Sequence, residues 1–87
     1  MRNAYQSVLK NYFRDTLIHT RDALELTQAQ MAEKLAMDHR SFAKLDHGIN
    51  CCSAITLALF LIYCCDDPMC FLRELKVALE AENDRVA

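Results

Sequence analysis

The sequence predicts an all-α domain built from five helices. Its 87 residues include one Gly and one Pro, and they contain almost no alternating runs of β-branched side chains, which disfavours strands. With 53% apolar residues, a chain of this length builds a single compact core. We therefore expect one domain over residues 1–84 and a frayed C-terminal tail over residues 85–87.

The first two helices are marked by an apolar stripe and by a capping box. Apolar side chains recur at three- and four-residue steps over residues 4–24, which predicts a long amphipathic helix. Thr27 followed three residues later by Gln30 has the spacing of a capping box, in which each side chain bonds the backbone of the other residue. This box predicts a second, short helix that ends near Leu35.

A third short helix follows after a tight connection. Asp38 is suited to the N-cap position, and Gly48 is suited to the left-handed position just past a helix end. These two residues predict a helix over residues 39–47. Residues 27–48 therefore specify two short helices around a turn.

Two further helices complete the predicted domain. Ser53 is placed to cap a mostly apolar helix that ends near Cys64, and Asp67-Pro68 opens a fifth helix. We expect the polar residues 80–85 to lie outside that helix. Its apolar positions, which fit either a core stripe or a dimer seam, are Leu72, Leu75 and Leu79.

Residues 27–48, TQAQMAEKLAMDHRSFAKLDHG, resemble the helix-turn-helix of the phage repressor and Cro family, also called the XRE family. The matching positions are the helix start Thr27 and Gln28, the small residue Ala32 where the helices touch, and the ending Asp46 and Gly48. With the flanking helices, the resemblance covers roughly residues 17–75. It implies a five-helix repressor-like domain in which helices two and three form the helix-turn-helix.

The resemblance also implies sequence-specific binding of double-stranded DNA and regulation of transcription, of the repressor type. In this family the third helix enters the major groove, where side chains reach base edges. The positions that would read bases are His39, Arg40, Ala43 and Lys44. The positions that would contact phosphate are Thr27, Gln28, His47 and Asn50.

Three departures from the family pattern affect this expectation. Where the family has Glu paired with an Arg at the end of helix one, this chain has Asp46, which implies a structural ion pair with Arg21. Where the family often has Gly in the turn, this chain has Ala36. The loop after Gly48, residues 49–52, lacks the basic residues of relatives, which predicts weaker phosphate binding and a shallower salt dependence.

The charge distribution is consistent with local rather than indiscriminate DNA binding. The formal charge of −2 excludes a general polycation. Residues 1–48 hold seven Lys and Arg against six Asp and Glu, whereas residues 49–87 hold three against six. The negative excess therefore lies mainly away from the predicted motif.

The five cysteines allow four interpretations. An odd, paired set is a poor disulfide framework, so we expect free thiols that pack as small apolar side chains. A redox-responsive regulator is an alternative, with Cys70 in the first turn of a helix as the candidate thiol. The spacing is wrong for a common zinc knuckle with His47, and a hydrolase based on His47 and Cys51 lacks pocket-forming loops. We expect no enzyme activity, metal or cofactor.

The single motif and the short apolar runs also predict the partners and the location of the protein. One motif reads about half of a two-fold operator, which predicts a homodimer through the fifth helix or through Tyr5 and Leu9 of the first. The alternative is an interaction module of the same fold that binds an unidentified protein, as an antitoxin-like or scaffold subunit. The longest apolar run, residues 57–65, is too short to span a membrane, and a secretory signal is lacking, which predicts a cytoplasmic protein.

Overall fold

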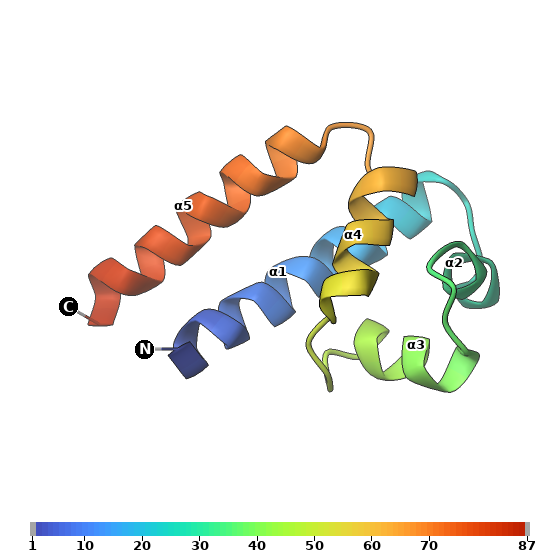
Figure 1. Cartoon of the computed structure of the whole chain (residues 1–87), viewed down its shortest axis with the longest axis horizontal. Coiled ribbons are helices and arrows are strands. Elements are labelled where there is room, and N and C mark those ends of the chain that lie inside the picture. Colours follow the sequence, from blue (N-terminus) through green and yellow to red (C-terminus); the bar gives the residue numbers. More distant parts are fainter. Residues whose placement is uncertain (1, 87) are drawn as a thin grey trace.

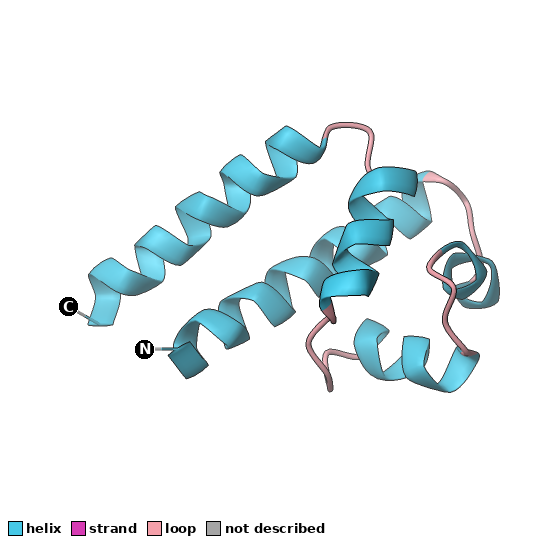
Figure 2. Ribbon diagram, viewed as in Figure 1, coloured by secondary structure: helices cyan, strands magenta, loops and turns pink. Residues whose placement is uncertain are grey.

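The computed structural model describes residues 2–86, and within them the chain forms five helices and no strand (Figure 1, Figure 2). The expected all-α class is confirmed for this part of the chain. The helices, in chain order, are α1 (Arg2–Ala23), α2 (Gln28–Lys34), α3 (His39–Asp46), α4 (Ala54–Tyr63) and α5 (Pro68–Val86).

The two long helices, α1 and α5, pack against each other in antiparallel directions (Figure 1). The Tyr5 hydroxyl donates to Asn83 Oδ1 at 3.0 Å, and the Tyr12 hydroxyl donates to Glu74 Oε2 at 3.0 Å. Burial and the Glu74 carboxylate raise the pKa of Tyr12 to about 12. The phenol is a hydrogen-bond donor at neutral pH, and its bond to Glu74 links the two helices near the middle of α1.

Three aromatic rings join α1, α4 and α5 in the core. The Phe13 and Phe60 rings meet edge to face at a centroid distance of 5.1 Å, and the Phe60 and Phe71 rings lie 5.8 Å apart. Such tilted pairs stabilise a core beyond the burial of their area. The remaining buried apolar residues are Leu17, Met31, Ala32, Leu35, Phe42, Leu45 and Cys64.

The predicted caps of α2, α3 and α4 are confirmed. Thr27 Oγ1 accepts from the Gln30 N–H at 3.1 Å, and the Thr27 N–H donates to Gln30 Oε1 at 2.8 Å. Asp38 Oδ2 accepts from the Ser41 N–H at 3.2 Å, and Ser53 Oγ accepts from the Thr56 N–H at 3.3 Å. Hydrogen bonds from the Ser41 side chain and backbone lower the pKa of Asp38.

The end of the fifth helix was predicted incorrectly. The polar residues 80–85 are helical, and α5 continues to Val86. Polar residues such as Glu are good helix formers, and the hydrogen bond between Tyr5 and Asn83 anchors this stretch to α1. Ala87, the last residue of the expected tail, lies outside the described residues.

Left-handed backbone ends both α2 and α3. Gly48 has a φ of 73° and takes the predicted position past α3. A Cβ there would lie 3.1 Å from both Cδ and Nη1 of Arg14, so glycine also gives that side chain room. Ala36, in the turn between α2 and α3, has a φ of 55°, a conformation that costs a residue with a Cβ roughly 1–2 kcal/mol.

Ala36→Gly should stabilise the protein, because glycine adopts this conformation without the Cβ clash. We expect the free energy of unfolding in urea to rise by about 0.5–1 kcal/mol. Ala58→Gly is the control, since Ala58 is exposed in the middle of α4 and its replacement should lower stability by about 1 kcal/mol. Equal losses in both variants would contradict the strain assigned to Ala36.

Candidate functional site

The short helices α2 and α3 bury one face each and expose the other. Residues 35–38 join them, and both helices pack into the core cluster through Met31 and Ala32 of α2 and Phe42 and Leu45 of α3. Because Phe42 and Leu45 are fully or almost fully buried, the opposite side of α3 faces solvent. The orientation of that face is therefore fixed by the core.

The exposed face of α3 carries the side chains predicted to read bases. His39, Arg40 and Lys44 are exposed, and Ala43 is half-buried. Arg40 and Lys44 are four residues apart and so share one side of the helix. Neither side chain has a hydrogen-bond or ion-pair partner within residues 2–86. Two cationic side chains are thus available to an external ligand on a helix held by the core.

Asp46 connects three helices through one buried carboxylate. Only 6% of the residue is exposed. Gln28 Nε2 of α2 donates to Asp46 Oδ2 at 2.8 Å, and Arg21 Nη2 of α1 lies 3.7 Å from the same oxygen. The ion pair expected from the resemblance is present, but its distance exceeds that of a hydrogen bond. Gln28 supplies the hydrogen bond, and Arg21 supplies the opposite charge.

The positions predicted to contact phosphate lie at the two ends of the α2–α3 unit. Thr27 is exposed and caps α2, whereas the half-buried Gln28 uses one of its two amide N–H groups on Asp46. His47 and Asn50 are exposed just after α3. The bond from Gln28 to Asp46 was not predicted from the sequence.

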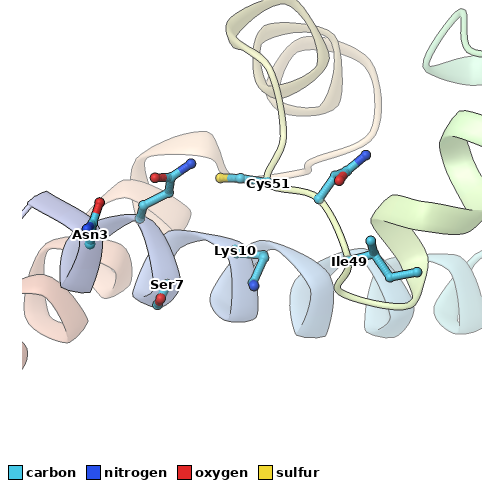
Figure 3. A pocket seen from close by; sticks show the side chains of 7 residues that line it. Asn3, Ser7, Lys10, Ile49 and Cys51 are labelled. Carbon is cyan, nitrogen blue, oxygen red and sulfur yellow. The ribbon is translucent and has the colours of Figure 1, made fainter.

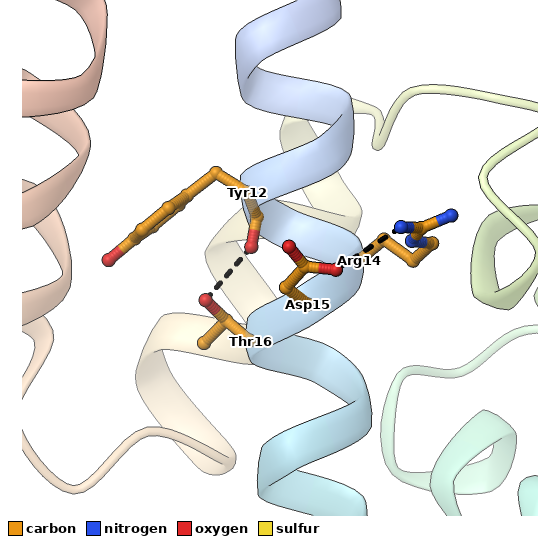
Figure 4. A network of polar contacts seen from close by, with 4 residues as sticks. All are labelled: Tyr12, Arg14, Asp15 and Thr16. Carbon is orange, nitrogen blue, oxygen red and sulfur yellow. Dashed lines mark hydrogen bonds and ion pairs between the residues drawn. The ribbon is translucent and has the colours of Figure 1, made fainter.

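Basic residues of α1 lie beside the loop after α3, which the sequence analysis also missed. The Arg14 side chain packs against Gly48, and Lys10 lines a cavity together with Asn50. Figure 4 shows Arg14 and Tyr12 leaving α1 on different sides, with Tyr12 directed toward α5. The only signal in the sequence was the four-residue spacing of Lys10 and Arg14, which places both on one side of a helix.

A second exposed surface lies on α4 and is apolar. Ile55, Ile62 and Tyr63 are each about two thirds exposed, at 67%, 68% and 69%. Ile55 and Ile62, with Ala58 and Leu59 between them, follow the helical spacing of a single stripe. Residues 48–65 contain no Asp, Glu, Lys, Arg or His. We call these five residues of α4 the α4 stripe.

The cysteines are free thiols in different environments. Cys64 is buried, which raises its pKa, and burial together with the neighbouring Cys51 raises the pKa of Cys52 to about 12. The Cys70 N–H donates to Asp67 Oδ1 at 3.1 Å. Within residues 2–86, no three His, Cys, Asp or Glu side chains are grouped so as to hold a metal ion. Because their pKa values are raised, Cys52 and Cys64 remain protonated thiols at neutral pH.

Comparison with protein-family models, curated proteins and solved structures finds no match for this chain. No helix within the described part of the chain is long and apolar enough to cross a membrane.

Arg21→Met should destabilise the fold, because it leaves the buried Asp46 carboxylate without an opposite charge. We expect a loss of about 3 kcal/mol in the free energy of unfolding, measured in urea. The double variant Arg21→Met/Asp46→Leu should recover most of this loss, since it removes the buried charge as well. A double variant less stable than Arg21→Met would show that the ion pair does not account for the loss.

Proposed function

We propose that this chain is a helix-turn-helix protein that binds duplex DNA sequence-specifically through α3 and represses transcription. The observation that carries the proposal is the exposed face of α3, where Arg40 and Lys44 have no partner within the described residues. A helix with side chains is about 10–12 Å across, which fits the major groove. The buried Phe42 and Leu45 on the opposite side support a fixed docking orientation.

Each of the four residues expected to read bases has a role that suits its chemistry. Arg40 has the planar fork that pairs with O6 and N7 of guanine, a contact worth about 1–3 kcal/mol of discrimination. Lys44 reaches a guanine or a phosphate, His39 donates or accepts at a base edge, and Ala43 packs on a thymine methyl group. In this proposal Thr27, Gln28, His47 and Asn50 contact the phosphates that set the register of α3.

The alternative function is binding of a protein partner by the same fold. The negative net charge and the uncharged loop after Gly48 favour it. Titration of binding to a random duplex with salt separates the two functions, because neutralising phosphates makes affinity fall as salt rises. A flat response would favour the protein partner.

A thiol-responsive regulator has less support. The raised pKa values of Cys52 and Cys64 keep these thiols protonated, whereas a sensor needs an accessible thiolate. Cys70 remains the thiol to examine, by its mass after mild peroxide treatment.

We also propose that the DNA-binding form is a homodimer, and that the second copy packs on the α4 stripe. The stripe exposes on the order of 400 Å² of apolar surface, comparable with the largest patch on a typical monomer. Because the stripe carries no charge, it is complementary to a second copy of itself. Pairing two copies buries about 800 Å² in total, an area typical of a weak interface. In this proposal the dimer is stabilised when both copies bind one DNA duplex.

The direction of α4 suits this arrangement. Figure 1 shows that α4 begins at the loop after α3 and extends away from α3. If the two-fold axis of the dimer runs parallel to α4, both copies of α3 lie at the same end of the dimer. That is the geometry needed to read two half-sites of one operator. The surfaces on α5 and near Tyr5 and Leu9 remain the other candidates for the dimer contact.

Arg40→Ala should relax the base preference at one position of each half-site, because the bidentate contact to guanine is lost. The measurement is selection from random duplexes by the wild type and the variant at two salt concentrations. Arg73→Ala on α5 is the control, since it removes an equal charge from an exposed position away from α3. An unchanged selected sequence with Arg40→Ala would remove Arg40 from base reading.

Ile62→Glu should weaken the dimer at least tenfold, because two carboxylates enter an apolar contact. The dissociation constant is measured by sedimentation equilibrium, free and with the selected duplex. Val77→Glu is the control, because Val77 is 66% exposed on α5 and gains the same charge. If Val77→Glu disrupts the dimer and Ile62→Glu does not, the contact lies on α5 instead.

A further inference from the structure

A polar cavity lies between the beginning of α1 and the loop that follows α3. Its volume is about 330 Å³. Asn3, Ser7 and Lys10 line it from α1, and Asn50 lines it from the loop. Figure 3 shows Asn3, Ser7 and Lys10 along α1, and Ile49 and Cys51 on the neighbouring loop. The side chains from α1 are at least 39 residues away in the sequence from those of the loop.

The lining of this cavity has the chemistry of a phosphate-binding surface. The amides of Asn3 and Asn50, the Ser7 hydroxyl and the Lys10 ammonium are all hydrogen-bond donors. None of the described residues that line the cavity carries a carboxylate. The positive charge of Lys10 attracts an anion, and the neutral donors suit one with several acceptor oxygens, such as a phosphodiester.

The position of the cavity is fixed relative to α3. The N–H groups of Ile49 and Asn50 donate to the carbonyl oxygen of Lys44, at 2.9 and 3.4 Å. These bonds hold the loop against the last turn of α3. Figure 1 shows the beginning of α1, this loop and α3 along one edge of the molecule. A DNA strand that contacts Lys44 and His47 therefore has the cavity beside it.

We propose that this cavity binds the phosphodiester backbone of duplex DNA next to the site contacted by α3. The proposal rests on the proposed function of α3. It assigns to α1 the charged backbone contact that the uncharged loop, residues 49–52, cannot supply. Lys10 is the charged contact, and Asn3, Ser7 and Asn50 donate hydrogen bonds to the phosphate oxygens. The two turns of α1 between Asn3 and Lys10 span about 10 Å along the helix axis.

Lys10→Ala tests this proposal by its effect on salt dependence. We expect the affinity for every duplex to fall about three- to tenfold at low salt, and the slope of log affinity against log salt to become shallower by about one. The selected base sequence should not change, because a phosphate contact carries no sequence information. Binding is measured by fluorescence anisotropy with the wild-type selected duplex and with a random duplex.

Lys76→Ala is the matched control, since it removes a lysine that pairs with Glu80 at an exposed position on α5. Thermal unfolding checks that both variants fold. If Lys10→Ala and Lys76→Ala have the same salt slope while Arg40→Ala alters base preference, the cavity is not a backbone site and the function of α3 stands. If the wild type binds no duplex, the proposed function itself fails.

Discussion

The buried Asp46 carboxylate lies where α1, α2 and α3 meet, and the placement of the exposed face of α3 depends on it. A carboxylate that is 6% exposed is costly unless it has partners, and here Gln28 and Arg21 share one of its oxygens. The other oxygen, Oδ1, has no hydrogen-bond partner within the described residues. Because any displacement of α3 would separate the Asp46 carboxylate from Gln28 and Arg21, these contacts fix the orientation of α3 relative to α1 and α2.

This orientation divides the surface of the molecule into faces of different chemistry. α3 presents unpaired cations, the beginning of α1 presents neutral donors and Lys10, and α4 presents an uncharged apolar stripe. The three faces are compatible with one assembly, in which two copies meet through α4 and each copy contacts DNA through α3 and α1. The net charge of −2 does not oppose this assembly, because the excess of acidic residues lies in residues 49–87.

Local signals allowed most of the fold to be predicted. Caps such as Thr27 and Asp38 act within one turn, and the left-handed position past a helix end favours the glycine found at Gly48. Both features can therefore be recognised in the sequence. The placement of Lys10 beside Asn50 was not predictable, because it depends on how α1 packs against a loop 40 residues away. The full length of α5 was missed for the same reason, since a contact with α1 supports its polar end.

The most direct test of the central claim maps the DNA-binding surface residue by residue. The measurement is a nuclear magnetic resonance titration of the ¹⁵N-labelled protein with the selected duplex, in which changes in amide chemical shift are followed. The account predicts the largest changes in α3, in the loop at residues 47–50 and in α1 between residues 3 and 10. Changes confined to α5, or no changes at all with duplex in excess, would contradict it.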